Sequence, residues 1–314
     1  MGLQNGKDVF FMEDILIFTL SVLLGAVSLL LFYGRKTDGK RENRPYGRAA
    51  DRDDGTPQRV YITGDTHRDF SGIRRFCRTM HTRRKDVLII LGDSGLNYYE
   101  DIRDDKLKAE VSKLNITLFC LHGNKECRPE HIKSYGVRTF CGGRVYYEPK
   151  YPHIFFAADG EVYTFEGRKY IVMGGAHSVD KQDCLENGKP FWEDEMPSGE
   201  AKAKFEARLT AEGHRIFGIL THTCPIDYLP TEVFISARQT VSHASKCKKT
   251  GLPKPFKPDI DRSTEEWLGK IEKQTAYRIW YCGHYHVDKQ IDRIHMMHRE
   301  IRRLHGNGYG DTDE

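Results

Sequence analysis

Seven side chains that can bind metal ions stand in five short motifs spread along this chain. The motifs are Asp65-Thr66-His67, Gly92-Asp93, Gly123-Asn124, Thr221-His222 and Gly283-His284-Tyr285-His286. They supply two aspartates, one asparagine and four histidines, which is a full ligand set for two ions about 3.5–4 Å apart. Two metal ions at this spacing recur in proteins that hydrolyse phosphoryl esters. A lone Asp-x-His would be weak support for such a site, but five motifs in this order are strong support.

The mixture of donor atoms limits the choice of metal. Carboxylate and amide oxygens with imidazole nitrogens suit Mn, Fe, Zn or Ni better than a soft metal selected by cysteine. We expect two divalent transition-metal ions, with manganese first among the candidates. Asp93 can bridge both ions, and Asn124 adds a neutral oxygen that limits the negative charge. Because two ions that share a water make hydroxide available near neutral pH, the sequence predicts hydrolysis of phosphomonoesters or phosphodiesters through a metal-bridging hydroxide.

The first three motifs each follow a short apolar stretch that indicates a β-strand. Three strands and two intervening helices are predicted at residues 60–63, 87–91, 117–121, 71–80 and 104–114. Apolar strands joined by helices indicate a buried parallel sheet. Since ligands bind at the carboxyl ends of such strands, Asp65, Asp93 and Asn124 stand where a binding site is expected.

The second half of the domain has shorter predicted strands. They cover residues 154–157, 162–165, 170–173, 216–220 and 278–282. Glu166-Gly167 fits a hairpin turn, and a charged helix is expected over about 200–212. Ser263 is expected to cap a further helix, with Glu266 completing a capping box. The whole pattern predicts an α/β fold with two packed sheets and helices outside them.

Taken together, these motifs resemble the calcineurin-like metallophosphoesterase superfamily, over about residues 58–305. The bacterial and phage members carry similar blocks, here LGDSGLNYY (91–99), GGAHSVD (174–180), WEDEMPS (192–198) and GHYH (283–286). The resemblance implies a four-layer α/β/β/α sandwich of two packed mixed sheets. It also implies one metal site made of Asp65, His67, Asp93 and His286, and a second made of Asp93, Asn124, His222 and His284.

Two residues depart from the family's pattern, and they are candidate catalytic residues. Lys125 stands where the family has a histidine that protonates the leaving oxygen or stabilises charge on the phosphoryl group. Lysine can do the second as a cation, but its ordinary pKa of about 10.4 suits proton donation less well than the value of about 6.5 for histidine. Arg68 replaces a common glycine and could clamp a phosphate, obstruct the turn or face solvent. His177 or His122 could approach the substrate and compensate, or could be histidines with no role.

The N-terminal segment has a different character. After residues 1–14, an apolar run of 18 uncharged residues, 15–32, can just cross a hydrocarbon core of about 30 Å at roughly 1.5 Å per residue. Basic residues follow the run rather than precede it, the reverse of a secretory signal. The sequence therefore predicts a single uncleaved transmembrane helix over 15–33, with the catalytic domain in the cytoplasm. A buried core helix and a misread upstream start are the alternatives.

Three further segments complete the predicted organisation. Residues 34–57 form a basic and polar linker, 58–305 the metallophosphoesterase-like domain and 306–314 a disordered tail. Within the domain, 236–262 is an insertion with seven Lys or Arg and two Asp. This insertion is either a solvated surface loop or a mobile basic flap that attracts anionic substrate.

The bulk composition leaves three classes of function. The net charge of +4 is mild and gives no strong nucleic-acid signal, and the eight cysteines are expected to be reduced and mostly buried. The first class is a membrane-tethered dimetal phosphoesterase acting on a small molecule, a nucleotide or a phosphoprotein. The second is a catalytically impaired relative that binds a phosphorylated partner, which Lys125 favours. The third is a metal-free structural adaptor. The complete ligand set favours the enzyme.

Overall fold

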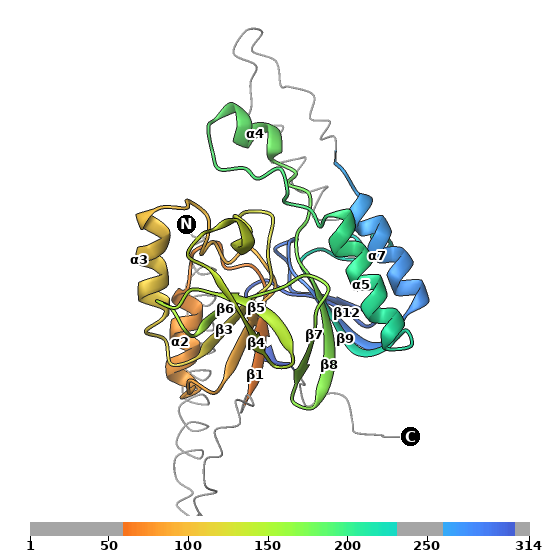
Figure 1. Ribbon diagram of the computed structural model, residues 1–314, viewed down its shortest axis with the longest axis horizontal. Helices are drawn as coiled ribbons and strands as arrows, with labels where there is room; N and C mark the ends of the chain where they lie inside the picture. Colours follow the sequence, from red (N-terminus) through yellow and green to blue (C-terminus); the bar gives the residue numbers. More distant parts are fainter. Residues whose placement is uncertain (1–58, 231–259, 305–314) are drawn as a thin grey trace, which may run out of the picture. The chain divides into compact units, whose positions relative to one another are not determined.

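Two β-sheets form the centre of the computed structural model, which describes residues 59–230 and 260–304 (Figure 1). The first sheet has seven strands in the order β13-β1-β2-β3-β6-β5-β4, and the second has six in the order β11-β12-β10-β9-β8-β7. In each sheet four central strands run parallel, and antiparallel strands flank them. Both sheets are therefore mixed, which confirms the predicted α/β class.

The strands and helices are short. The strands are β1 (Val60–Thr63), β2 (Val87–Ile90), β3 (Thr117–Cys120), β4 (Gly136–Phe140), β5 (Gly143–Tyr147), β6 (Ile154–Ala157), β7 (Val162–Phe165), β8 (Arg168–Met173), β9 (Arg215–Thr221), β10 (Ala276–Cys282), β11 (Lys289–Ile291), β12 (Ile294–Met296) and β13 (Arg302–Arg303). The α-helices are α2 (Ser71–Thr79), α3 (Ile102–Val111), α4 (Lys181–Glu186), α5 (Gly199–Ala211) and α7 (Ser263–Gln274). Two 3₁₀ turns are η1 (Pro129–His131) and η2 (Ile226–Tyr228).

Three apolar clusters separate four layers. The central cluster lies between the two sheets and joins residues such as Phe119 of β3 and Leu220 of β9. A second cluster packs the first sheet against α2 and α3, with Ile73 among its members. The third packs the other sheet against α5 and α7 through Phe205 and Leu268. Helices thus cover the outer face of each sheet (Figure 1), and the layer order is α/β/β/α.

The buried strands read as apolar runs because both of their faces are covered. In β1, Val60 and Ile62 join the cluster between the sheets, whereas Tyr61 joins the cluster under α2 and α3. A strand buried on both faces lacks the polar alternation of a half-exposed strand. This explains why the central strands could be found from sequence.

Two local predictions had different outcomes. Glu166 and Gly167 form the turn between β7 and β8 with positive φ angles of 48° and 76°, as a tight hairpin turn requires. The capping box predicted at Ser263 and Glu266 is wrong, because Arg262 precedes α7 and makes no side-chain cap. Instead, Asp261 Oδ1 accepts a hydrogen bond from the Ser263 backbone N–H at 2.8 Å.

Several sequence predictions concern segments outside the described residues. These are the transmembrane helix at 15–33, the linker at 34–57, most of the basic insertion at 236–262 and the tail at 306–314. Within residues 59–230 and 260–304, the helices are all too short or too polar to cross a membrane.

Candidate metal centre

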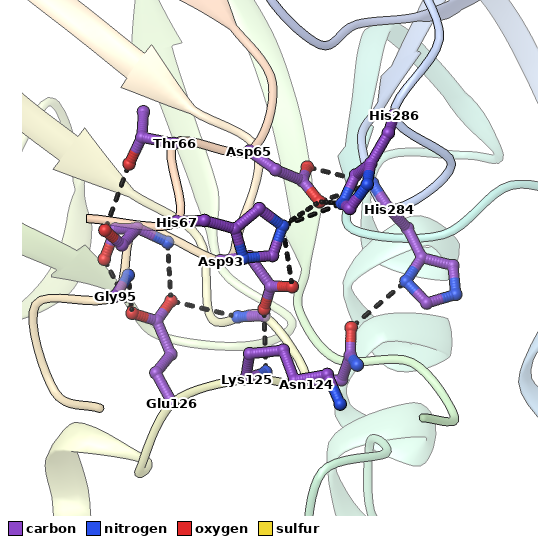
Figure 2. Close-up of polar contacts among 12 residues, drawn as sticks. Asp65, Thr66, His67, Asp93, Gly95, Asn124, Lys125, Glu126, His284 and His286 are labelled. Carbon is purple, nitrogen blue, oxygen red and sulfur yellow. Dashed lines mark hydrogen bonds and ion pairs between the residues drawn. The ribbon is translucent and has the colours of Figure 1, made fainter. Parts of the chain in front are cut away.

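The predicted ligands lie together at the carboxyl ends of strands from both sheets. Asp65, Asp93 and Asn124 come after β1, β2 and β3, and His222 and His284 come after β9 and β10. Parallel neighbours end at the same edge of a sheet, so these loops meet although they lie far apart in sequence. Figure 2 shows the side chains of Asp65, His67, Asp93, Asn124, His284 and His286 gathered in one region.

One ligand group consists of Asp65, His67 and His286. The Nε2 atoms of the two histidines are 2.7 Å apart. Asp65 Oδ2 lies 3.4 Å from His286 Nε2 and 3.7 Å from His67 Nε2. These three side chains present a carboxylate oxygen and two imidazole nitrogens to one point, which suits a divalent transition metal.

A second group consists of Asp65, Asp93 and His222. Asp93 Oδ1 lies 3.8 Å from His222 Nε2. Asn124 Oδ1 adjoins this group, at 2.8 Å from His222 Nε2 and 3.1 Å from His284 Nδ1. Because Asn124 Nδ2 donates to Ser178 Oγ at 2.7 Å, the amide oxygen is the atom turned toward the histidines.

The two groups share one more carboxylate than the family resemblance implies. That resemblance makes Asp93 the shared ligand, and Asp93 Oδ2 does lie 3.8 Å from His67 Nε2. Asp65, however, also belongs to both groups. Its carboxylate accepts the backbone N–H of His284 at 2.9 Å, which ties the first sheet's loop to the second sheet's loop. Two carboxylates therefore stand between the groups.

The orientation of His222 fits metal binding. Its Nδ1 lies 2.7 Å from the backbone carbonyl oxygen of Leu91, and a carbonyl can only accept. Nδ1 therefore carries the proton, and the lone pair of Nε2 faces Asp93 and Asn124. A second bond of this kind, which fixes the tautomer, is a regular feature of metal-binding histidines. The donor set and this tautomer both fit a pair of divalent ions.

The backbone at the site adopts a conformation that is uncommon for residues other than glycine. His67, Arg68, Asp93, His284 and His286 have φ angles of 43°, 72°, 47°, 70° and 53°. Each such residue costs on the order of 1 kcal/mol or more and persists only where its surroundings hold it. Four of the five are predicted ligands, so the fold accepts strain where the ligands must converge.

Two motif glycines are required by close contacts. A Cβ at Gly92, whose φ is +101°, would lie 2.1 Å from His222 Nδ1. A Cβ at Gly123 would lie 2.0 Å from Asp93 Oδ1 and 2.1 Å from the Asp93 nitrogen. The glycine in each Gly-Asp or Gly-Asn motif thus makes room for a ligand delivered by another strand.

Burial and charge shift the pKa values of the ligands in opposite directions. Burial alone would raise the pKa of Asp65, but the hydrogen bond to His286 and the field of His222 lower it to about 2. Burial, together with the neighbouring charge of Asp65, raises the pKa of Asp93. Burial lowers the pKa of His284 well below its ordinary value, and the field of His222 adds to this shift. His284 is therefore held neutral, the form that binds metal.

Comparison with known proteins identifies the family. The calcineurin-like phosphoesterase family model matches residues 58–288, a stretch that contains all seven predicted ligands. This chain belongs to the calcineurin-like phosphoesterase family. The family typically binds two divalent metal ions, in agreement with the two candidate groups.

Other comparisons add only distant likenesses. No curated protein matches the sequence. Among solved structures, TT1561 of Thermus thermophilus is similar at 13% identity over 79% of this chain and 98% of that chain, with a TM-score of 0.40. The protein of unknown function AQ665 from Aquifex aeolicus is similar at 13% identity over 54% and 85%, with a TM-score of 0.27.

Glu126 is a residue of the phosphoesterase domain that we did not single out from sequence. It is fully buried, and its carboxylate accepts bonds from Ser94 Oγ at 2.6 Å and from the Gly95 nitrogen at 3.0 Å. These bonds hold the loop that carries Asp93. Burial and the charge of Asp93 raise the pKa of Glu126 to about 7. Its position two residues after Asn124 was the available signal.

Lys125 holds the site through its backbone and pairs its side chain with Asp180. Its backbone N–H donates to Asp93 Oδ1 at 2.7 Å. Its ammonium contacts the carboxylate of Asp180 and lies 3.8 Å from Cys184 Sγ. Burial opposes the charge of Lys125, but Asp180 outweighs this effect and raises the pKa above its ordinary value. Lys125 is therefore a paired cation beside the ligands.

Arg68 is bound to the start of α3. Its guanidinium donates to Asp104 Oδ1 and to the Gly95 carbonyl, both at 2.5 Å, and to the Arg103 carbonyl at 3.1 Å. These bonds fix the turn after Asp-x-His. This structural role was not among those considered from sequence, and the geometry gives no support to a phosphate clamp.

His177 and His122 lie near the ligands but in neither group. His177 Nδ1 is 3.5 Å from Glu195 Oε1. His122 is buried, and its Nε2 lies 2.9 Å from the Glu126 carbonyl oxygen. Burial lowers the pKa of His122 well below its ordinary value. His122 is therefore neutral and committed to the backbone, whereas His177 keeps its Nε2 outside that pairing.

Proposed function

We propose that this protein is a hydrolase that splits phosphomonoesters or phosphodiesters with two divalent metal ions, manganese first among the candidates. One observation carries the proposal. Strand ends from both sheets bring together two adjoining groups of ligand atoms, one of Asp65, His67 and His286 and one of Asp65, Asp93 and His222. Asn124 and His284 lie beside the second group. When bound, such a pair of ions supplies an activated water and offsets the charge on the phosphoryl oxygens.

The protein's own residues prepare the site for this chemistry. Glu126 and the Lys125 backbone hold the Asp93 loop, and Ser178 orients Asn124. These contacts fix the ligands before substrate arrives, which matters because displacements of about 1 Å can cost about 10²-fold in rate. We also propose that Lys125, as a cation near the ligands, attracts the anionic ester.

The direct test is hydrolysis by the full-length chain in detergent, loaded with Mn²⁺. We expect turnover of an aryl phosphate or of a bis-aryl phosphate, and loss of both activities in His222→Ala. The surface variant His131→Gln is the matched control, because His131 pairs with Asp194 at 3.3 Å and is exposed. A metal-loaded protein that hydrolyses neither ester would contradict the proposal.

A binding role is the second candidate. The pairing of Lys125 with Asp180 favours it, because an ammonium bound to a carboxylate is less suited to donate a proton to a leaving group. Here the chain would recognise a phosphorylated partner without turnover. Calorimetry with tungstate, a phosphate analogue, separates the candidates on the metal-loaded protein. Binding without hydrolysis of either ester would support the module, whereas hydrolysis of either would exclude it.

We further propose that residues 15–33 anchor the protein in a membrane with the phosphoesterase domain on the cytoplasmic side. The support is the apolar run and the basic residues after it. The chain should sediment with membranes and resist extraction by high salt. Complete release by salt would contradict the anchor.

A further inference from the structure

The loop that carries His177 borders the metal centre. It follows β8, which runs parallel to β9, and the His222 backbone N–H donates to the Met173 carbonyl at 3.1 Å. Ser178, the next residue, accepts the hydrogen bond that orients Asn124. His177 therefore stands one residue from a direct contact with a predicted ligand, without being a ligand itself.

Glu195 holds His177 from behind. Its side chain is 3% exposed, and Oε1 lies 3.5 Å from His177 Nδ1 and accepts the Ser178 N–H at 2.9 Å. Glu195 Oε2 is buried and has no hydrogen-bond partner among the described residues. The carboxylate can thus take a closer bond from Nδ1, and such contacts are often long before substrate binds. This pairing leaves His177 Nε2 as the atom that can face a substrate.

Two carboxylates besides Glu195 act on the imidazole of His177. Asp261 and Glu265, before and within α7, interact electrostatically with His177. Imidazole is the side chain best suited to pass a proton near neutral pH.

Other side chains near the ligands are less suited to donate a proton. The Lys125 ammonium is bound to Asp180, and His122 Nε2 is bound to the Glu126 carbonyl. His298 stacks on the predicted ligand His286, with ring centroids 5.0 Å apart and planes at 18°. Among the described residues, His177 combines a position beside the ligands with a carboxylate that can orient it.

We propose that His177, oriented by Glu195, protonates the leaving-group oxygen during ester hydrolysis. The inference rests on the proposed function. As the water oxygen bonds to phosphorus, the bond from phosphorus to the leaving oxygen breaks. Nε2 gives its proton to that oxygen, and the imidazole regains a proton that the attacking water releases. Atoms and charge balance with water as the only co-reactant. In this scheme Glu195 is a positioning residue.

The test compares two leaving groups in the full-length, Mn²⁺-loaded protein. An alkyl leaving group needs a proton, whereas 4-nitrophenolate departs as an anion. His177→Gln should lower kcat for an alkyl ester by about 10²–10⁴-fold and for the matching 4-nitrophenyl ester by less than about tenfold. Glu195→Gln should change the alkyl-to-aryl rate ratio in the same direction by a smaller factor. This ratio cancels any loss of folded protein, because both rates fall equally when a fraction of the sample is inactive.

The controls separate this inference from the proposed function. His131→Gln, which alters a surface histidine–carboxylate pair, should leave the ratio unchanged. Wild type that hydrolyses the aryl ester but not the alkyl ester, or a His177→Gln variant with an unaltered ratio, would overturn the proton donor and leave the phosphoesterase standing. Wild type with two metals that hydrolyses neither ester would remove both.

Discussion

A side chain at Gly123 would collide with the predicted ligand Asp93. We predict that Gly123→Ala weakens metal binding and lowers kcat/KM by about 10²-fold, because its Cβ would lie 2.0 Å from Asp93 Oδ1. Overpacking should also lower the free energy of unfolding by about 1–3 kcal/mol. Metal content, kinetics and denaturant unfolding of the variant measure these effects.

Gly72 provides the matched control. It lies in α2, where an added Cβ would meet no heavy atom within 4 Å. Gly72→Ala should therefore leave activity intact and raise the free energy of unfolding by about 0.4–1 kcal/mol. If Gly123→Ala behaved like Gly72→Ala, our account of the Gly-Asn motif would be wrong.

At the scale of residues, the candidate ligands could be selected from the sequence, whereas the residues that hold them in place could not. Asp-x-His and Gly-His-x-His are local patterns, so the sequence alone brings them to notice. Glu126 contacts Gly95, which lies 31 positions away, and Asp180 contacts Lys125, which lies 55 positions away. Glu195 contacts His177 from another loop. No local pattern encodes such pairings. Arg68 is a further example, because its partner Asp104 could not be predicted from the motif.

At the scale of elements, the N-terminus of α7 offers a sharp test. Asp261 Oδ1 binds the Ser263 N–H, whereas Ser263 is the first helical residue and caps nothing. We predict that Asp261→Ala lowers the free energy of unfolding by about 0.5–2 kcal/mol, and Ser263→Ala by less than about 0.5 kcal/mol. Denaturant unfolding of both variants decides between them, and the reverse order would restore the capping box predicted from sequence.

Central elements were predicted better than peripheral ones. The strands β1, β2, β3 and β6 are buried along their whole length, so each forms an apolar run between turns. The edge strand β4 is largely exposed and carries no such run, and β11 and β13 span only three and two residues. Pairing with a neighbour, rather than local sequence, makes these segments strands.

At the scale of the whole molecule, a buried histidine outside the ligand motifs should make stability depend on pH. His295 in β12 is 3% exposed, and burial, reinforced by the charge of Arg302, lowers its pKa to about 4. The unfolded chain binds this proton near pH 6.5, whereas the folded chain binds it only near pH 4. The free energy of unfolding is therefore highest above pH 6.5 and declines as the pH falls toward 4, because protonation favours the unfolded chain. We expect a loss of up to about 2 kcal/mol between pH 7 and pH 5.

His295→Phe isolates this contribution. Unfolding free energies are measured across that range with a chelator present, so that release of metal does not add to the slope. The variant should lose less stability on acidification than the wild type. Equal slopes for the two proteins would mean that His295 is not held neutral in the folded state.

The central claim is that the strand ends of both sheets build one centre for two metal ions. The most direct measurement is the metal content of the full-length chain after loading with Mn²⁺ and removal of excess metal. We predict about two ions per chain in the wild type and a loss of both in Asp93→Ala, because Asp93 lies against both ligand groups. Asp105→Ala, which removes a carboxylate paired with Lys150 instead, should retain both ions. One ion or none in the wild type, or an unchanged content in Asp93→Ala, would contradict the account.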